Sequence, residues 1–134
     1  MRSVKVSDFM AKRLVTLHPQ TNVVEAMSVL LDKKISGAPV VDDSGALVGV
    51  LSEVDLMKII IQDSYYDEAA GVVGDFMRFP VDTVDADTDI YSLAERFLAE
   101  HRRRYPVVRH GKLVGQISRR DVLRAAQESL RHEV

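Results

Sequence analysis

The chain has 134 residues, 46% of them hydrophobic, and a formal net charge of -2; these values are typical of one small globular domain or two very small ones and exclude a disordered chain and a general nucleic-acid coat. It contains no cysteine, which excludes disulfides, thiol catalysis and cysteine-ligated metals. No apolar run approaches the roughly 18 residues of a membrane span, and the N-terminus lacks a signal-peptide core, so we expect a soluble protein of the cytoplasm with no membrane partner.

The sequence contains an internal repeat with a shift of 67 positions. The segment VSDFM (6–10) returns as VGDFM (73–77). One residue is then missing from the second copy, after which GALVGVLSEVD (45–55) matches GKLVGQISRRD (111–121). Each copy has about 55 residues, which is small for an independent core, so we expect the two halves to pack on each other.

Both copies predict the element order β-α-β-β-α. A short apolar stretch (13–17 or 80–84) comes first, and a helix follows it with Asn22 or Asp89 as its N-cap. Apolar residues then recur at the spacing of one helical face. These residues are Val23, Ala26, Met27, Leu30 and Leu31 in the first copy and Ile90, Leu93, Ala94, Phe97 and Leu98 in the second.

Two β-rich runs and a last helix complete each copy. A turn at 43–45 joins the runs in the first copy, and His110-Gly111 suits a tight hairpin in the second. The last helix is expected to begin after Ser52 or Ser118. The predicted domains are residues 6–62 and 73–130, with a polar linker at 63–72.

This order of motifs resembles the CBS domain, which is named for cystathionine β-synthase, and two copies in tandem resemble the CBS pair or Bateman module. The resemblance covers roughly residues 6–128. Its strongest element is G-x-x-S-x-x-D after a strand, whose residues suit a turn, a phosphate and a ribose. This element is present twice, as Gly49, Ser52 and Asp55 and as Gly115, Ser118 and Asp121.

The resemblance implies a fold and a function. The fold is α/β (α+β), with two β-α-β-β-α units packed sheet to sheet about a pseudo-twofold axis, two clefts between the units and commonly a homodimer. The clefts of this family often bind adenosine-containing ligands: AMP first, then ADP, ATP, S-adenosylmethionine or an NAD-type dinucleotide. Such modules sense the ligand and regulate an attached or partner protein. No enzyme activity, required cofactor or metal is implied.

In cleft B, the resemblance places the end of the second copy against a segment of the first. Asp121 is expected to hold the ribose hydroxyls, and Arg119 and Arg120 the phosphate, because a carboxylate accepts two hydroxyls and arginine makes charge-assisted bonds. Small residues opposite them leave room for the base. The expected residues are Val15, Thr16, Ile35, Ser36, Gly37, Ala38, Pro39, Ser118, Arg119, Arg120 and Asp121.

Cleft A is expected to be the weaker site. Glu53 stands where the second copy has an arginine, and this repels phosphate, whereas three arginines precede Tyr105. Tyr105 either stacks on a base or fills the cleft. The expected residues are Ser52, Asp55, Thr83, Arg102, Arg103, Arg104, Tyr105 and Pro106.

Three alternatives stay open at this point. The serines and aspartates suit helix starts without any ligand, and arginines 102–104 suit a solvated helix end. The chain is also compatible with a dimerising scaffold whose clefts are empty. Residues 101–124 hold eight Lys/Arg and one acidic residue, a basic stripe that could touch nucleic acid. Few stacking aromatics accompany this stripe, which argues against DNA or RNA as a partner.

Overall fold

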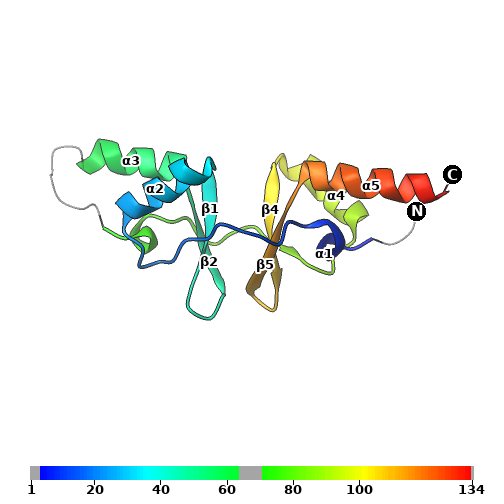
Figure 1. Ribbon diagram of the computed structural model, residues 1–134, viewed down its shortest axis with the longest axis horizontal. Coiled ribbons are helices and arrows are strands. Elements are labelled where there is room, and N and C mark those ends of the chain that lie inside the picture. The colour runs from blue at the N-terminus through cyan, green and yellow to red at the C-terminus, as the bar shows by residue number, and fades with distance from the viewer. Residues whose placement is uncertain (1–3, 64–70, 134) are drawn as a thin grey trace. The chain divides into compact units, whose positions relative to one another are not determined.

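The computed structural model describes residues 4–63 and 71–133, which fall into two compact units. Unit 1 comprises residues 1–14 and 82–134, and unit 2 comprises residues 15–81. Figure 1 shows that the helices of each unit lie on one side of its small sheet. Unit 1 contains α1 (Val6–Phe9), β3 (Val84–Asp85), α4 (Ile90–Glu100), β4 (Arg104–Arg109), β5 (Lys112–Ser118) and α5 (Arg119–Glu133). Unit 2 contains α2 (Val23–Lys33), β1 (Gly37–Val41), β2 (Leu47–Ser52), α3 (Glu53–Asp63) and the short 3-10 helix η1 (Val73–Asp75).

The leading segment of each repeat packs in the unit that holds the rest of the other repeat. In unit 1 the Val6 amide donates to the Thr88 carbonyl at 2.8 Å, and in unit 2 the Val73 amide donates to the Thr21 carbonyl at 2.8 Å. These two bonds join equivalent positions of the two repeats. The internal repeat of the sequence therefore reappears as matching contacts, although the compact units divide the chain at other points than the repeats do.

The predicted helices and their N-caps are confirmed. The Asn22 side chain accepts from the Val24 amide at 2.8 Å, and the Asp89 side chain accepts from the Ser92 amide at 2.9 Å. Most of the predicted apolar faces are buried or packed against the core. Leu31 and Leu98 are the exceptions in α2 and α4, because they are 75% and 77% exposed. Successive residues lie about 100° apart around a helix, so each of these leucines points to the side of the buried residue before it.

Both predicted hairpins form. β1 pairs with β2 and β4 with β5, each antiparallel. His110 and Gly111 have φ angles of 53° and 77°, as a type I′ turn requires. The strand expected at 80–84 is reduced to β3, which pairs in parallel with β4. The one expected at 13–17 is reduced to a bridge between Leu17 and Val40.

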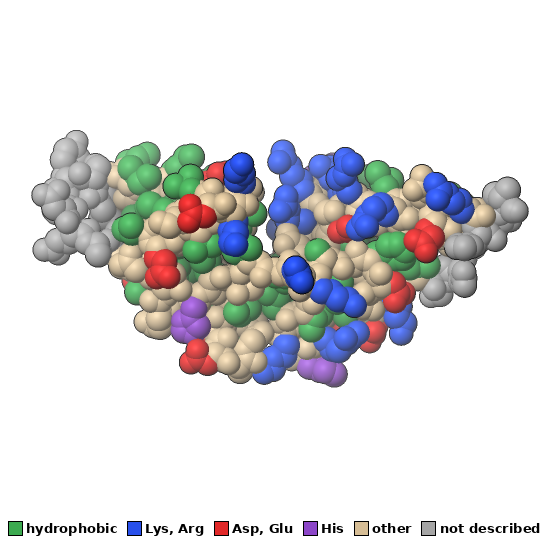
Figure 2. Space-filling view, viewed as in Figure 1, with side chains coloured by type: hydrophobic (Ala, Val, Ile, Leu, Met, Phe, Trp, Pro, Cys, Tyr) green, Lys and Arg blue, Asp and Glu red, His purple; other side chains and the backbone are tan. Residues whose placement is uncertain are grey.

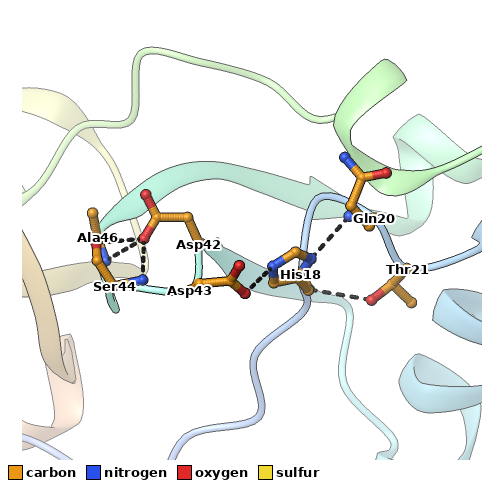
Figure 3. A network of polar contacts seen from close by, with 7 residues as sticks. All are labelled: His18, Gln20, Thr21, Asp42, Asp43, Ser44 and Ala46. Carbon is orange, nitrogen blue, oxygen red and sulfur yellow. Dashed lines mark hydrogen bonds and ion pairs between the residues drawn. The ribbon is translucent and has the colours of Figure 1, made fainter.

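The turn between β1 and β2 is held by side chains (Figure 3). The Asp42 carboxylate accepts from the amides of Ser44 at 2.9 Å and Ala46 at 3.0 Å. His18 Nδ1 accepts from the Gln20 amide at 3.0 Å, so its Nε2 carries the hydrogen and donates to Asp43 at 2.8 Å. The turn is thereby tied to the segment that precedes α2.

The glycine of each G-x-x-S-x-x-D motif lies inside a strand, so its interpretation as a turn residue is wrong. A Cβ on Gly49 would lie 2.8 Å from Met77 Cγ. A Cβ on Gly115 would lie 2.8 Å from Met10 Cγ and 2.9 Å from the carbonyl oxygen of Ala11. Each glycine therefore makes room for the leading segment of the other repeat.

In the described part of the chain, no helix is long and apolar enough to cross a membrane.

Candidate functional site

Ser118 and Asp121 form a reciprocal cap at the start of α5. One oxygen of the Asp121 carboxylate, Oδ2, accepts from the Ser118 amide at 2.8 Å and from the Ser118 hydroxyl at 3.0 Å. The Asp121 amide donates back to Ser118 Oγ at 3.3 Å. This is the arrangement of a capping box. The motif therefore has a local structural role, and that role leaves the second carboxylate oxygen to other partners.

Ser52 and Asp55 repeat this cap at the start of α3. Asp55 Oδ2 accepts from the Ser52 amide at 2.8 Å and from its hydroxyl at 2.9 Å, and the Asp55 amide lies 3.4 Å from Ser52 Oγ. The two copies of the motif thus have the same internal geometry. Differences between the two positions must come from the residues around them.

The second oxygen of each aspartate contacts an arginine from a different place in the fold. Asp121 Oδ1 pairs with Arg124, which lies three residues further along α5. Asp55 Oδ1 lies 3.4 Å from Nε of Arg78, which belongs to the segment after η1. The Asp121 side chain is 14% exposed and that of Asp55 is 5% exposed. A ligand hydroxyl that bonds either Oδ1 therefore competes with the arginine already there.

Four exposed arginines surround the start of α5. The Arg119 amide donates to the Arg103 carbonyl at 3.2 Å, and Arg104 lies opposite Ser118 in the β4–β5 ladder. Within the described residues, the side chains of Arg103, Arg104, Arg119 and Arg120 form no ion pair. The sequence assigned the first two to cleft A and the last two to cleft B, whereas the structure brings all four together in unit 1. Such a cluster at a helix N-terminus favours anions.

The equivalent place in unit 2 has no such cluster. The Glu53 amide donates to the Ser36 carbonyl at 2.9 Å, which matches the bond between Arg119 and Arg103. The positions of the four arginines are occupied there by Ser36, Gly37, Glu53 and Val54. Figure 2 shows blue Lys and Arg side chains gathered around the start of α5 and green apolar side chains along α3. The starts of α5 and α3 therefore differ in the charge around them, although their backbone bonds match.

Of the other residues expected in cleft A, several have partners inside unit 1. Arg102 pairs with Asp82. The carbonyl oxygen of Thr83 accepts from Arg96 Nη1 at 2.6 Å. Pro106 is half-buried in β4. These contacts occupy part of the polar surface that the sequence assigned to a ligand.

Tyr105 is fully buried in the core of unit 1. Its ring lies 4.8 Å from that of Phe97 and 4.4 Å from the Arg96 guanidinium. Its hydroxyl donates to Glu100 Oε1 at 2.9 Å. Burial and this bond raise the pKa of Tyr105, and the same bond, with one from Arg96, lowers the pKa of Glu100. The ring thus packs in the core of its own unit, which is neither of the two roles that the sequence left open.

Part of the first-copy segment that was expected in cleft B belongs to the strand β1. Ala38 and Pro39 are buried, while Ser36 and Thr16 are exposed and Val15 is half-buried. Ile35 packs against the core of unit 2. A Cβ on Gly37 would lie 3.0 Å from the Leu51 carbonyl oxygen. Gly37 is therefore needed for close pairing with β2, in addition to any room it leaves for a base.

Sequence reasoning missed Arg78 and Arg124. The contact of Arg124 with Asp121 was predictable, because the two residues are three positions apart on one helix. The contact of Arg78 with Asp55 was not, because Arg78 is 23 positions from Asp55 and its equivalent in the other repeat is Ala11. Only the folded chain brings Arg78 to Asp55.

Comparison with known proteins places these observations in a family. A family model described as the CBS domain matches residues 6–62 and 73–128. The chain is 33% identical over 153 residues to the CBS domain-containing protein CBSX2, chloroplastic, of Arabidopsis thaliana, and the match covers 90% of this chain and 63% of that protein. The chain thus spans less than two thirds of the length of that relative.

Two further matches bear on fold and context. A crystal structure of CBSX2 in complex with AMP is 38% identical, has a TM-score of 0.78 and is matched over 93% of this chain and 97% of that one. The A-adding tRNA nucleotidyltransferase of Aquifex aeolicus is 30% identical over 127 residues, which are 95% of this chain but only 15% of that enzyme. A segment similar to nearly the whole of this chain therefore also occurs within a much longer protein.

Proposed function

The chain belongs to the CBS domain family, and we propose that it is a regulatory module, not an enzyme, that binds an adenosine-containing ligand. The observation that carries the proposal is the group at the start of α5, where a carboxylate and four exposed arginines lie together in unit 1. A ribose requires hydrogen-bond acceptors and a phosphate requires cations, and this group supplies both. The similarity to CBSX2, whose crystal structure holds AMP, supports the same ligand class.

Each side chain of the group has a proposed role. Asp121 accepts the ribose hydroxyls through Oδ1 once Arg124 moves aside. Arg119, Arg120 and the first-turn amides of α5 bind the phosphate. That Val15, Thr16 and residues 35–39 contact the base stays a prediction, as do a location in the cytoplasm and a regulated partner protein.

AMP is the first ligand to test, followed by ADP, ATP, S-adenosylmethionine and NADH. A ligand present at 100 times its dissociation constant stabilises a folded protein by about 2.7 kcal/mol. We therefore expect at least one of these compounds, at millimolar concentration, to raise the melting temperature in a thermal-shift assay. If none of them does so, the proposal is wrong.

Asp121→Ala should abolish the stabilisation by the ligand. The matched control is Asp55→Ala, which removes the equivalent cap from α3. Isothermal titration calorimetry on both variants separates the loss of a cap from the loss of a site. An Asp121→Ala protein that binds as tightly as the wild type would move the site away from α5.

A dimerising scaffold with empty clefts is the second candidate function. The observation that favours it is the apolar surface of α3, where Val54, Met57, Ile60 and Ile61 are 54–77% exposed. Exposed apolar residues grouped on one helix mark a contact surface in many proteins. Under this alternative the chain dimerises, but no adenosine compound changes its melting temperature.

A further inference from the structure

Ala11 and Arg78 occupy the same place in the two units. The amide of Ala11 donates to the Gln116 carbonyl at 2.8 Å, and the Gln116 amide donates back to the Ala11 carbonyl at 3.0 Å. Arg78 exchanges the same two bonds with Val50, at 2.9 and 3.0 Å. Residues 11 and 78 are 67 positions apart, which is the shift of the repeat. Residue 11 therefore pairs with β5, the strand before Asp121, and residue 78 pairs with β2, the strand before Asp55. Both residues belong to the leading segment that each unit takes from the other repeat.

The side chains at these two places differ in their reach. The Arg78 guanidinium lies 3.4 Å from Asp55 Oδ1, whereas the methyl group of Ala11 is too short for such a contact with Asp121. Asp55 is consequently held from two segments: its own Ser52 binds Oδ2, and Arg78 binds Oδ1. Among the described residues, the side-chain partners of Asp121 are Ser118 and Arg124, and both belong to the same end of the chain as Asp121 itself.

We propose that Arg78 closes the ribose position at Asp55, so that the chain binds one adenosine-type ligand, at Asp121, and not two. This inference rests on the proposed function. Two vicinal hydroxyls that bind Asp55 must compete with its ion pair to Arg78, at a carboxylate that is 5% exposed. In unit 1 the ligand competes with Arg124, but the phosphate gains the arginines around the start of α5. In unit 2 it meets Glu53 instead.

The backbone amides of Ser52 and Ser118 report on the two positions separately, because each donates to the Oδ2 atom of its own aspartate. The experiment is a two-dimensional amide NMR titration with adenosine, the part that all candidate ligands share, and with AMP. In the wild type we expect a saturable shift at Ser118 and none at Ser52. In Arg78→Ala, adenosine should also shift Ser52, with a dissociation constant at least about tenfold below the highest concentration that leaves Ser52 of the wild type unshifted.

The reciprocal substitution is Ala11→Arg. Because residue 11 has the same backbone pairing as residue 78, the new arginine should reach Asp121 and weaken the Ser118 response by about tenfold. Arg13→Ala is the matched control for the loss of an exposed cation, and it should leave both responses unchanged. The dispersion of the amide spectrum shows whether each variant is folded.

The outcomes separate this inference from the proposed function. If Ser118 responds and Arg78→Ala brings no response at Ser52, the inference is wrong and the proposed function stands. If Ser52 responds in the wild type and loses that response in Arg78→Ala, Arg78 holds the ligand and the inference is again wrong. A response at Ser52 of Arg78→Ala without any at Ser118 shows that Arg78 closes the position at Asp55, but it overturns binding at Asp121 and with it both the one-site inference and the proposed site. No response in any variant overturns both.

Discussion

Single residues with the same sequence motif acquire different surroundings in the two units. Ser52 and Asp55 make the same cap as Ser118 and Asp121, with amide-to-carboxylate distances of 2.8 Å in both. The motif alone is thus compatible with a helix cap and with a ligand site. What distinguishes the two aspartates is the arginine that reaches the second oxygen and the charge of the nearest exposed side chains.

The N-cap of α4 should make the stability of the chain depend on pH. Hydrogen bonds from the backbone amide and then the hydroxyl of Ser92 hold the pKa of Asp89 below its usual 3.8. A carboxyl whose pKa is lowered on folding stabilises the fold above its unfolded pKa, and this stabilisation is lost as the pH falls through the folded pKa. Asp89→Asn lacks this titration, and Asn22 shows that an asparagine can cap the equivalent helix.

The measurement is the melting temperature of the wild type and of Asp89→Asn against pH. We expect the wild type to be the more stable by a constant margin above about pH 5 and the margin to shrink below about pH 4. Other acidic groups titrate in both proteins, so the difference isolates Asp89. A margin that persists at about pH 2.5 would contradict this assignment.

Short segments position the site more than the long helices do. The leading segment of each repeat lies against the last strand of the unit that it joins, and a glycine in that strand makes room for a methionine. The same segment brings residue 11 or 78 beside the capped aspartate. A change in how this segment packs against the strand should therefore alter both the stability of the unit and the solvent access of its capped aspartate.

Gly115→Ala should destabilise the chain more than Gly49→Ala. The added methyl at position 115 meets the Ala11 carbonyl oxygen at 2.9 Å, which is backbone, whereas the nearest atoms at position 49 all belong to the flexible side chain of Met77. Overpacking of this kind costs about 1–3 kcal/mol, and we expect Gly115→Ala at the upper end. Urea denaturation of both variants gives the two free energies of unfolding. Equal losses would show that Ala11 moves as easily as Met77.

Taken as a whole, the chain is uneven in its surface chemistry. Unit 1 has four exposed arginines around the start of α5, and unit 2 has an exposed apolar surface on α3. We assign the first surface to the ligand and propose the second as the contact between two copies in a homodimer. The two functions would then be carried by opposite repeats of one duplicated sequence.

Met57→Glu should dissociate the homodimer. Met57 is 58% exposed on α3, so a glutamate is tolerated in the folded monomer but places a charge in an apolar contact. Sedimentation equilibrium should show a dimer for the wild type and a dissociation constant raised by at least about tenfold for the variant. Gln127→Glu on α5, at the position equivalent to Ile61, is the matched control. A wild-type chain that is monomeric at all concentrations would rule out the homodimer.

Much of this protein follows from local sequence patterns. The repeat, the four long helices, both hairpins and the N-caps at Asn22 and Asp89 are predictable, because each depends on residues within a few positions of one another. The family resemblance depends on the same order of local motifs. The expectation that the apolar helix faces are core is wrong for Leu31 and Leu98 and, in α3, for Val54, Met57, Ile60 and Ile61. Periodicity alone does not mark the edges of an apolar stripe.

The remaining features depend on residues that are far apart in the chain. The amino-acid sequence determined that there are two equivalent units with two equivalent capped aspartates. The tertiary structure decided which leading segment joins which unit, that Tyr105 is buried, that four arginines meet at α5 and that Arg78 reaches Asp55. A side chain acts on its spatial neighbours, and the pairing of distant segments, set by burial of the whole core, decides which neighbours these are.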